Sequence, residues 1–332
     1  MEKQPLLNVK NLRTHFHTER GRVTAVDGIS FQVDKGEILG VVGESGCGKS
    51  VMSQSIMRLF DEKYTAEYEG EIELSGQNLL DLPISQMQKI RGNDISMIFQ
   101  DPLSSLNPVY TIGDQISESI LLHQNVTRKV ATEKAIEMLR LTGIPAPEKR
   151  VNEYPHQLSG GMQQRVMIAM ALSCQPKLLI ADEPTTALDV TIQSQILDLI
   201  LELNEKLGMG VIFITHDLGV VSEICTRVMV MYLGQVVEET DVDSLFSKPL
   251  HPYTKGLMKS IPQLEGDRSQ KLHVIEGSVP SLDNIPKGCR FAERCPFADE
   301  LCRESTPELR TYDGDKKVRC WHFEKIAQHE EG

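Results

Sequence analysis

The sequence predicts an α/β fold with a mainly parallel central sheet, a helical subdomain inserted between core strands, and a small cysteine-rich C-terminal extension. Two observations predict the core: a phosphate-binding pattern at Gly43–Ser50, and short apolar segments that alternate with helical periodicity. A third observation predicts the extension, because turn residues and cysteines replace long periodic stretches after about residue 262.

Composition limits the classes of function. The chain has 332 residues and a formal net charge of −12. This charge argues against coating nucleic acid, since phosphate neutralisation needs excess Lys and Arg. The longest apolar runs, such as Val228–Leu233, are far shorter than the roughly 20 residues that span a bilayer. Because no apolar run follows Met1–Pro5, we expect no signal peptide and a cytosolic protein, or one held at a membrane by partners.

The first elements are strands. Apolar and β-branched residues predict strands at Leu7–Leu12, Ala25–Val33 and Glu37–Val42. The third is a short apolar run bounded by glycines, as expected of a buried parallel strand. An amphipathic stretch, Met52–Leu59, follows the phosphate-binding pattern and predicts a helix.

Residues 101–176 are richer in helical periodicity than the rest of the core. Helices are expected at Ile112–Leu122 and Thr132–Leu141, and prolines break this region into pieces. We therefore predict a helical subdomain between core strands.

Buried strands are expected again at Lys177–Ala181 and Val211–Ile214. Between them, apolar residues at helical spacing predict an amphipathic helix over Thr191–Leu207, which Gly208 is placed to end. Alternation of strands and helices favours a mainly parallel sheet.

The phosphate-binding pattern is G-x-x-x-x-G-K-S/T, which occurs in many unrelated nucleotide hydrolases. Its glycines let backbone N–H groups surround a phosphate, and the following helix adds its positive end. The lysine would contact the β- and γ-phosphates, and the final hydroxyl would bind Mg²⁺. A chance glycine-rich turn is the alternative, which the strand before it and the helix after it disfavour. The residues that match it are Gly43, Glu44, Ser45, Gly46, Cys47, Gly48, Lys49 and Ser50.

Two carboxylates end the apolar strand that precedes the amphipathic helix. Asp182 suits direct or indirect binding of Mg²⁺, and Glu183 suits orienting and polarising an attacking water. Acidic residues at a strand end also serve as helix caps, which is the alternative interpretation.

Ser159, Gly160 and Gly161 precede a predicted helix at Met162–Leu172, and a Ser with two glycines there forms a second anion site. A simple serine N-cap is the alternative. Three further polar residues follow strands or precede a helix and could be capping residues: Gln100, His216 and Asp189.

Together these motifs resemble, in order and over roughly residues 6–235, the ATP-binding cassette ATPases. The resemblance implies a head-to-tail dimer with two ATP molecules at the interface. It gives Glu183 the role of general base, His216 that of holding the γ-phosphate, and Gln100 that of binding Mg²⁺ and linking the site to membrane subunits. Ser159 and Gly161 would contact the γ-phosphate held by the phosphate loop of the other subunit. Gly160, Gln163 and Asp189 are also expected among the nucleotide-binding residues. Phe16 is at about the position of the family's adenine-stacking aromatic residue.

A narrower resemblance covers essentially the whole chain. It points to ATPase subunits of bacterial dipeptide and oligopeptide importers, and its segments are Met97–Pro108, Ala181–Ile192, His251–Thr254, Ser260–Pro262, Gly277–Pro280 and Cys289–Phe291. It implies two permease subunits, a second ATPase subunit or second copy, and an extracytoplasmic peptide-binding protein. We divide the chain into a nucleotide-binding domain at 6–262 and an extension at 263–332.

Two alternatives stay open for the function. Relatives with the same extension import nickel or sugars, and other cassette proteins are soluble and act on nucleic acid or the ribosome. The latter usually carry two cassettes in one chain, whereas this chain has one and an acidic balance.

The extension concentrates four of the seven cysteines: Cys289, Cys295, Cys302 and Cys320. Four clustered thiolates suit tetrahedral zinc or an iron–sulfur cluster. The resemblance to cluster-carrying importer subunits favours a 4Fe–4S cluster over zinc. Unliganded thiols are the third possibility, but a short region with little apolar content needs a staple to fold. The role of a metal or cluster bound by these cysteines would be structural clamping or redox sensing.

Overall fold

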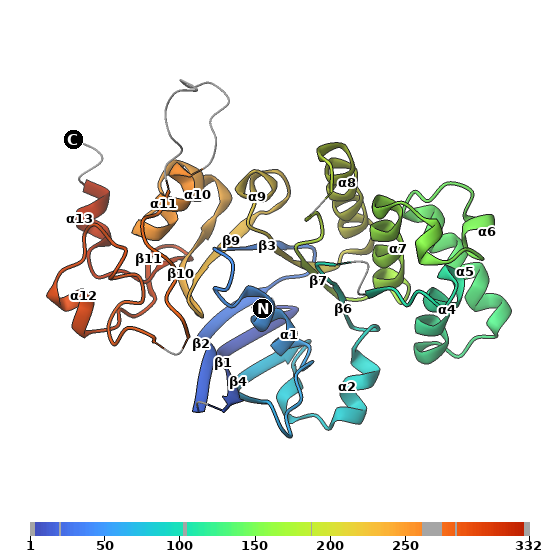
Figure 1. Ribbon diagram of the computed structural model, residues 1–332, viewed down its shortest axis with the longest axis horizontal. Coiled ribbons are helices and arrows are strands. Elements are labelled where there is room, and N and C mark those ends of the chain that lie inside the picture. Colours follow the sequence, from blue (N-terminus) through green and yellow to red (C-terminus); the bar gives the residue numbers. More distant parts are fainter. Residues whose placement is uncertain are drawn as a thin grey trace. The chain divides into compact units, whose positions relative to one another are not determined.

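The computed structural model describes residues 4–19, 21–101, 105–186, 188–260, 274–282 and 284–328 (Figure 1). The chain forms two compact units. The first unit consists of Met1–Asn8, Gln32–Ile38 and Glu73–Ile214, and the second of Val9–Phe31, Leu39–Ile72 and Thr215–Gly332. The expected domain boundary at residues 262 and 263 lies outside the described residues.

Three buried parallel strands form the centre of the first unit, in the order β8 (Gly210–Ile214), β7 (Leu178–Asp182) and β6 (Ile95–Ile98). Every residue of these strands is buried, as expected of parallel strands that read as continuous apolar runs. The predicted strands at 177–181 and 211–214 are therefore confirmed. A small hairpin of this unit pairs the end of β4 (Ala66–Leu74) with β5 (Gln77–Asn78) and leads through η1 (Leu79–Asp81) to α2 (Ile84–Ile90).

A helical insertion separates β6 from β7, as predicted (Figure 1). Its helix α7 packs against β6, α4 and α5. The helix α5 begins four residues earlier than predicted, because the Thr127 side chain accepts a hydrogen bond from the Val130 N–H and caps it. The elements are α4 (Ile112–His123), α5 (Arg128–Leu141), α6 (Pro147–Arg150), η2 (Pro155–Gln157) and α7 (Gly160–Leu172).

The predicted amphipathic helix is α8 (Val190–Leu207). Its buried face includes Ile196, Ile200 and Leu203, at the spacing of one helical stripe. Gly208 ends it with φ 61°, a left-handed conformation that glycine adopts without steric cost.

The second unit contains two groups of strands. In one group, β1 (Leu7–Thr18) lies between β2 (Gly21–Val33) and β4. The strand β1 extends well beyond the predicted Leu12, and the Thr18 hydroxyl at its end donates to the Gly21 carbonyl at 2.8 Å. The short helix α1 (Lys49–Ile56) belongs to this unit as well.

The other group has the order β3 (Ile38–Val42), β9 (Arg227–Tyr232), β10 (Gln235–Asp241), β12 (Lys316–Val318) and β11 (Arg310–Asp313). Strands β3 and β9 are parallel, whereas the pairs β9–β10, β10–β12 and β12–β11 are antiparallel. The extension therefore adds two strands to the edge of β10, which sequence periodicity did not predict. Its remaining helices are α12 (Glu300–Glu304) and α13 (Phe323–Gln328), and the helices that precede it are α9 (Leu218–Ile224), α10 (Val242–Ser247) and α11 (Pro252–Lys259).

Across the part of the chain that the structure describes, every helix is too short or too polar to cross a bilayer.

Candidate functional site

The phosphate-binding pattern Gly43–Ser50 joins the buried strand β3 to helix α1, as its sequence context predicted. Two of its glycines are required by geometry. A Cβ on Gly43 (φ 152°) would lie 2.3 Å from the Met231 carbonyl oxygen, and a Cβ on Gly48 (φ 102°) would lie 2.8 Å from that of Ala25. Backbone therefore packs tightly against this loop, which we call the P-loop, and holds its curvature.

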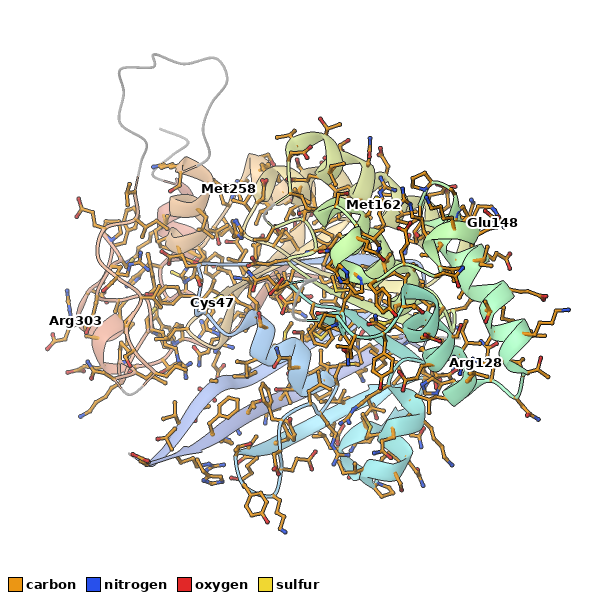
Figure 2. All side chains as sticks on the ribbon, turned by 45° about the vertical axis from the view of Figure 1, so that its right-hand side comes forward. Cys47, Arg128, Glu148, Met162, Met258 and Arg303 are labelled. Atoms are coloured by element: carbon orange, nitrogen blue, oxygen red, sulfur yellow. The ribbon has the colours of Figure 1, made fainter. Side chains whose placement is uncertain are left out.

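Lys49 is buried, and its Nζ donates to the carbonyls of Gly43 at 2.7 Å and Glu44 at 3.3 Å. Its ammonium group thus lies back along the loop, where a phosphate-binding lysine is expected. Cys47, labelled in Figure 2, is buried as well, and burial raises the pKa of its thiol. A neutral, buried thiol behaves here as a small apolar side chain that fills space in the loop.

Residues far from the P-loop in sequence hold it in place. The Glu44 N–H donates to the Tyr253 hydroxyl at 2.7 Å, and the Gly234 N–H donates to the Cys47 carbonyl at 2.8 Å. Burial raises the pKa of Tyr253 far above its usual range, so its hydroxyl stays protonated. The sequence analysis missed these supports, because no local pattern connects them to the loop.

Phe16 is half-buried on β1, and its ring meets that of Phe60 edge-on at 4.9 Å between centroids. Thr14, two residues earlier and so on the same face of the strand, shares a hydrogen bond of 2.8 Å with Ser55 of α1. Phe16 therefore faces the helix that begins at the P-loop, whereas the neighbouring His15 is buried and bonds Thr24. Adenine stacking by Phe16 stays a prediction.

His216 follows β8 directly, and its side chain is exposed. The preceding N–H, from Thr215, donates to the carbonyl of Val41 in β3 at 3.1 Å. Asp217 caps α9 by accepting from the Gly219 N–H. The N-cap of α9 is therefore Asp217 and not His216, which the sequence had offered as a capping residue.

Gln100 and Glu183 meet in the first unit, at the carboxyl ends of β6 and β7. The Gln100 side-chain amide donates to the Glu183 carboxylate at 2.9 Å, and the Thr186 hydroxyl donates to the same oxygen at 3.0 Å. Glu183 has φ 49°, a left-handed conformation rare for residues with a side chain. Such strain is typical of functional positions, where the surrounding structure imposes it. Here the Glu183 N–H donates to the Ile214 carbonyl at 2.9 Å.

Asp182 is buried at the last position of β7, in register with Ile214 of β8. The segment that follows it is tied to α7, since the Gln164 side-chain amide donates to the Pro184 carbonyl at 2.6 Å. Gln164 was not among the predicted site residues. It links the helix of the second anion motif to the segment that carries Glu183.

Ser159 is the N-cap of α7, and its hydroxyl accepts from the Met162 N–H at 3.4 Å. Gly160 faces open space, and a Cβ on Gly161 would meet Ile192 at 3.0 Å. The Gln163 side chain is buried and donates to the Pro155 carbonyl at 2.8 Å, so it holds the segment before the helix. The start of α7 is thus open to solvent at Gly160, and the buried Gln163 side chain ties it to the segment that precedes the helix.

Asp189 caps α8 by accepting from the Ile192 N–H at 3.0 Å. The possibility that Asp189 caps the following helix is therefore confirmed. Of the predicted nucleotide residues, Gln100, Asp182, Glu183, Asp189 and the Ser159 motif belong to the first unit, and Phe16, the P-loop and His216 to the second.

The four cysteines of the extension line one cavity, all within the second unit. Burial raises the pKa of each thiol: that of Cys295 reaches about 11 and that of Cys320 about 12. Among the causes at Cys295 and Cys320 are the charges of the other cysteines, because the groups lie close together. Apolar and aromatic residues complete the lining, among them Phe291, Ala292, Phe297, Trp321 and Ile326.

Two further potential ligands lie beside this cavity. His322 Nε2 lies 2.9 Å from the Asp299 carboxylate, and single ligand atoms of Asp299, Cys302 and His322 all lie within 4.8 Å of one another. Asp299 also accepts from the Cys302 N–H at 3.0 Å, and that hydrogen bond, ahead of the one from His322, lowers the pKa of its carboxyl to about 2. Neither residue was predicted from the sequence, because only the cysteines of the extension were considered as ligands.

Comparison with known proteins matches two segments of the chain to known families. Residues 26–186 match the ABC transporter family, and residues 237–302 match the family described as "Oligopeptide/dipeptide transporter, C-terminal region". The oligopeptide transport ATP-binding protein AppD of Bacillus subtilis is 52% identical over 96% of this chain and 97% of its own length. The chain belongs to the ATP-binding proteins of the oligopeptide and dipeptide ABC transporters.

Other relatives agree with this assignment. The "Probable peptide ABC transporter ATP-binding protein y4tR" of Sinorhizobium fredii is 54% identical over 97% of this chain and 96% of its own length. A solved bacterial ABC transporter cassette, MJ0796, described as dimeric, is 29% identical with a TM-score of 0.63 and covers 71% of this chain and 98% of its own. The α/β cassette fold expected from the sequence is thereby confirmed for this peptide transporter ATPase.

Proposed function

We propose that this chain is the subunit that binds and hydrolyses ATP to drive the uptake of dipeptides or oligopeptides by a membrane importer. The Gln100–Glu183 hydrogen bond supports hydrolysis most directly, because it presents a carboxylate beside an amide at the strand end where the family's base is expected. The 54% identity to a peptide transporter protein over nearly the whole chain supports the solute class.

In this proposal the P-loop binds the ATP phosphates through its backbone N–H groups. Lys49 would meet the β- and γ-phosphates, the Ser50 hydroxyl and Asp182 would hold Mg²⁺, and Phe16 would stack on adenine. When bound, Mg²⁺ would neutralise charge that develops on the phosphate oxygens.

Glu183 accepts a proton from the attacking water, and Gln100 orients the Glu183 carboxylate through the observed hydrogen bond. Gln100 would also provide an oxygen for Mg²⁺, and His216 would donate to the γ-phosphate. The Thr186 hydroxyl leaves the Glu183 carboxylate little rotational freedom, which favours a single productive geometry.

The second anion motif acts on the nucleotide of a partner cassette. Ser159, Gly160, Gly161 and Gln163 at the start of α7, with Asp189 at the start of α8, would complete that site in a head-to-tail dimer. Two ATP molecules would then close the dimer, and hydrolysis would open it. The solved MJ0796 cassette is described as a dimer, which supports this arrangement.

The proposed partners follow from the importer function. They are two transmembrane permease subunits, a second ATPase subunit or a second copy of this chain, and an extracytoplasmic peptide-binding protein, with no nucleic acid. The chain would sit on the cytoplasmic face of the membrane, held there by the permease subunits.

We also propose that Cys289, Cys295, Cys302 and Cys320 hold a 4Fe–4S cluster, with zinc as the alternative. The residues fit such a group, since four thiols line one cavity whose apolar surroundings keep unliganded thiols protonated. A bound cluster would act as a cross-link between distant parts of the extension and could exchange an electron. Asp299 and His322 would then orient Cys302 and Cys320, because the His322 N–H lies 3.4 Å from the Cys320 sulfur.

Purification of the tagged chain from gently solubilised native membranes, without oxygen, tests the function. We expect two multi-span permeases, a second ATPase and a peptide-binding protein to accompany it. Recovery from the soluble fraction with nucleic acid or ribosomes would contradict the importer function, and a binding protein for nickel or sugar would contradict the peptide substrate.

The same preparation tests the metal site. We expect about four iron atoms and four acid-labile sulfides per chain, and the Cys302→Ser variant should lose them. Stoichiometric zinc without iron would replace the cluster by a zinc site.

A further inference from the structure

The C-terminal extension reaches the P-loop through one arginine. Arg294, which directly precedes Cys295, donates from Nη1 to Glu44 Oε2 at 2.7 Å and from Nη2 to Glu44 Oε1 at 3.0 Å. Glu44 is the second residue of the P-loop. These two hydrogen bonds join a guanidinium to both oxygens of one carboxylate, so the contact is a bidentate ion pair.

We propose that Arg294 is a positioning residue of the ATP site, which fixes the first turn of the P-loop and neutralises the charge of Glu44. This inference rests on the proposed binding of ATP by that loop. It makes the extension part of the nucleotide-binding apparatus and not only an appended metal module.

Arg294 is itself held firmly. Its side chain is only 4% exposed. Its Nε donates to the Glu276 carbonyl at 3.0 Å, and its Nη2 also donates to the Ile275 carbonyl at 3.2 Å. A guanidinium fixed by two backbone carbonyls provides a rigid bidentate anchor, which a flexible lysine would not reproduce.

Glu44 is held from a second side by its backbone. Its N–H donates to the hydroxyl of Tyr253, whose ring packs against those of Tyr232 and Phe291 at centroid distances of 4.7 Å and 5.4 Å. Without Arg294, the Glu44 carboxylate would be an uncompensated negative charge next to a loop that receives a triphosphate. Repulsion between those charges would weaken ATP binding.

The other half of the P-loop has a parallel support. Arg290, directly after Cys289, donates to the Leu233 carbonyl and to the Asp27 carboxylate. Gly234, which directly follows Leu233 in the sequence, donates its N–H to the Cys47 carbonyl of the P-loop. The segment between Cys289 and Cys295 therefore supports the loop at two points, directly at Glu44 and indirectly at Cys47.

Equilibrium ATP binding tests the proposal, measured by calorimetry in a Glu183→Gln background so that nucleotide is not consumed. We expect Arg294→Ala to raise the Kd for ATP by roughly 5- to 30-fold, since a partly buried charged pair is broken and one carboxylate is left unpaired. In a Glu44→Gln chain the same substitution should change the Kd by less than about twofold, because no charge is left to compensate.

The matched control is Arg310→Ala, which removes an exposed arginine of the extension that lies over the Trp321 ring at 5.1 Å. It should leave ATP affinity unchanged. Metal content and circular dichroism of each variant report whether the extension stays folded.

An unchanged Kd in Arg294→Ala would overturn the proposal, and so would an equal loss of affinity with and without Glu44. Absence of ATP binding by the chain that carries both Arg294 and Glu44 would instead contradict the proposed ATPase function.

Discussion

The amide of Gln100 donates a hydrogen bond to the carboxylate of Glu183 at 2.9 Å, across the ends of two adjacent parallel strands. Because β6 and β7 are in parallel register, the residues that follow them emerge at the same edge of the sheet. The pairing gives the proposed base a fixed orientation, and two predictions follow from it.

Glu183→Gln should abolish turnover while ATP still binds. An amide cannot accept the proton of the attacking water, so we expect phosphate release to fall by at least about 100-fold. ATP affinity should stay within about threefold, measured by calorimetry. Glu202→Gln is the control, as it makes the same change at an exposed position of α8. Rapid hydrolysis by Glu183→Gln would remove this residue from the general-base role.

Gln100→Ala should lower kcat by roughly tenfold, the effect expected when one orienting hydrogen bond of about 1–1.5 kcal/mol is lost. Glu183 would keep its bond from Thr186, so activity should not vanish. Steady-state phosphate release measures the change. Gln88→Ala removes an exposed glutamine of α2 and should have no effect. An unaltered kcat in Gln100→Ala would show that the bond has no part in hydrolysis.

Stability should depend on pH through His251. Burial is the main cause that lowers the pKa of this imidazole from 6.5 to about 3. The unfolded chain therefore binds more protons than the folded chain between these values, so stability is fully present above pH 6.5 and is lost as pH falls toward 3. From pH 7 to pH 5 we expect a loss of about 1–2 kcal/mol from this group.

His251→Asn tests this dependence. Asparagine can still accept from the Tyr253 N–H, as His251 Nδ1 does at 3.1 Å, but it does not titrate. Urea unfolding followed by Trp321 fluorescence should show a flatter pH dependence than in the parent, even if the midpoint itself is lower. The buried Glu238, whose carboxyl pKa is raised mainly by burial, contributes with the opposite sign in both proteins and cancels in the comparison. Equal pH slopes in the two proteins would contradict the assignment.

Metal removal should affect both the extension and ATP binding. Chelation, or the Cys302→Ser substitution, should lower the unfolding temperature of the second unit by roughly 5 °C, because the proposed metal cross-link within the extension would be lost. The Kd for ATP should rise toward that of Arg294→Ala, since Arg294 adjoins a cysteine of the site. Cys174→Ser, which changes a cysteine of the first unit, is the control. If metal-free protein bound ATP as tightly as loaded protein, the extension would support the P-loop without its metal.

The sequence predicted those features that depend on local pattern. The P-loop, the strand ending at Asp182 and helix α8 were found because fixed spacing, apolar runs and a terminal glycine lie within a few residues of one another. The start of α5 at Arg128 was missed, because its N-cap, Thr127, lies five residues before the predicted start at Thr132 and was not recognised as a cap. Strands β11 and β12 were missed because they are short, and because β12 pairs with β10 far away in the sequence.

The supporting residues of the site escaped for the same physical reason. Arg294 and Glu44 are 250 residues apart, and Tyr253 and Glu44 are 209 apart, so only the fold brings them together. Asp299 and His322 likewise become a pair only once the extension folds. Sequence patterns thus identified the residues expected to act on ATP, whereas the residues that hold them in place required the structure.

Peptide uptake by cells tests the central claim most directly. A strain that lacks this chain would be complemented with the parent chain or with Glu183→Gln at equal expression, and the uptake of a labelled peptide measured. We predict that the parent chain restores uptake and that the Glu183→Gln chain does not. Restoration by Glu183→Gln, or peptide uptake that does not depend on this chain at all, would contradict it.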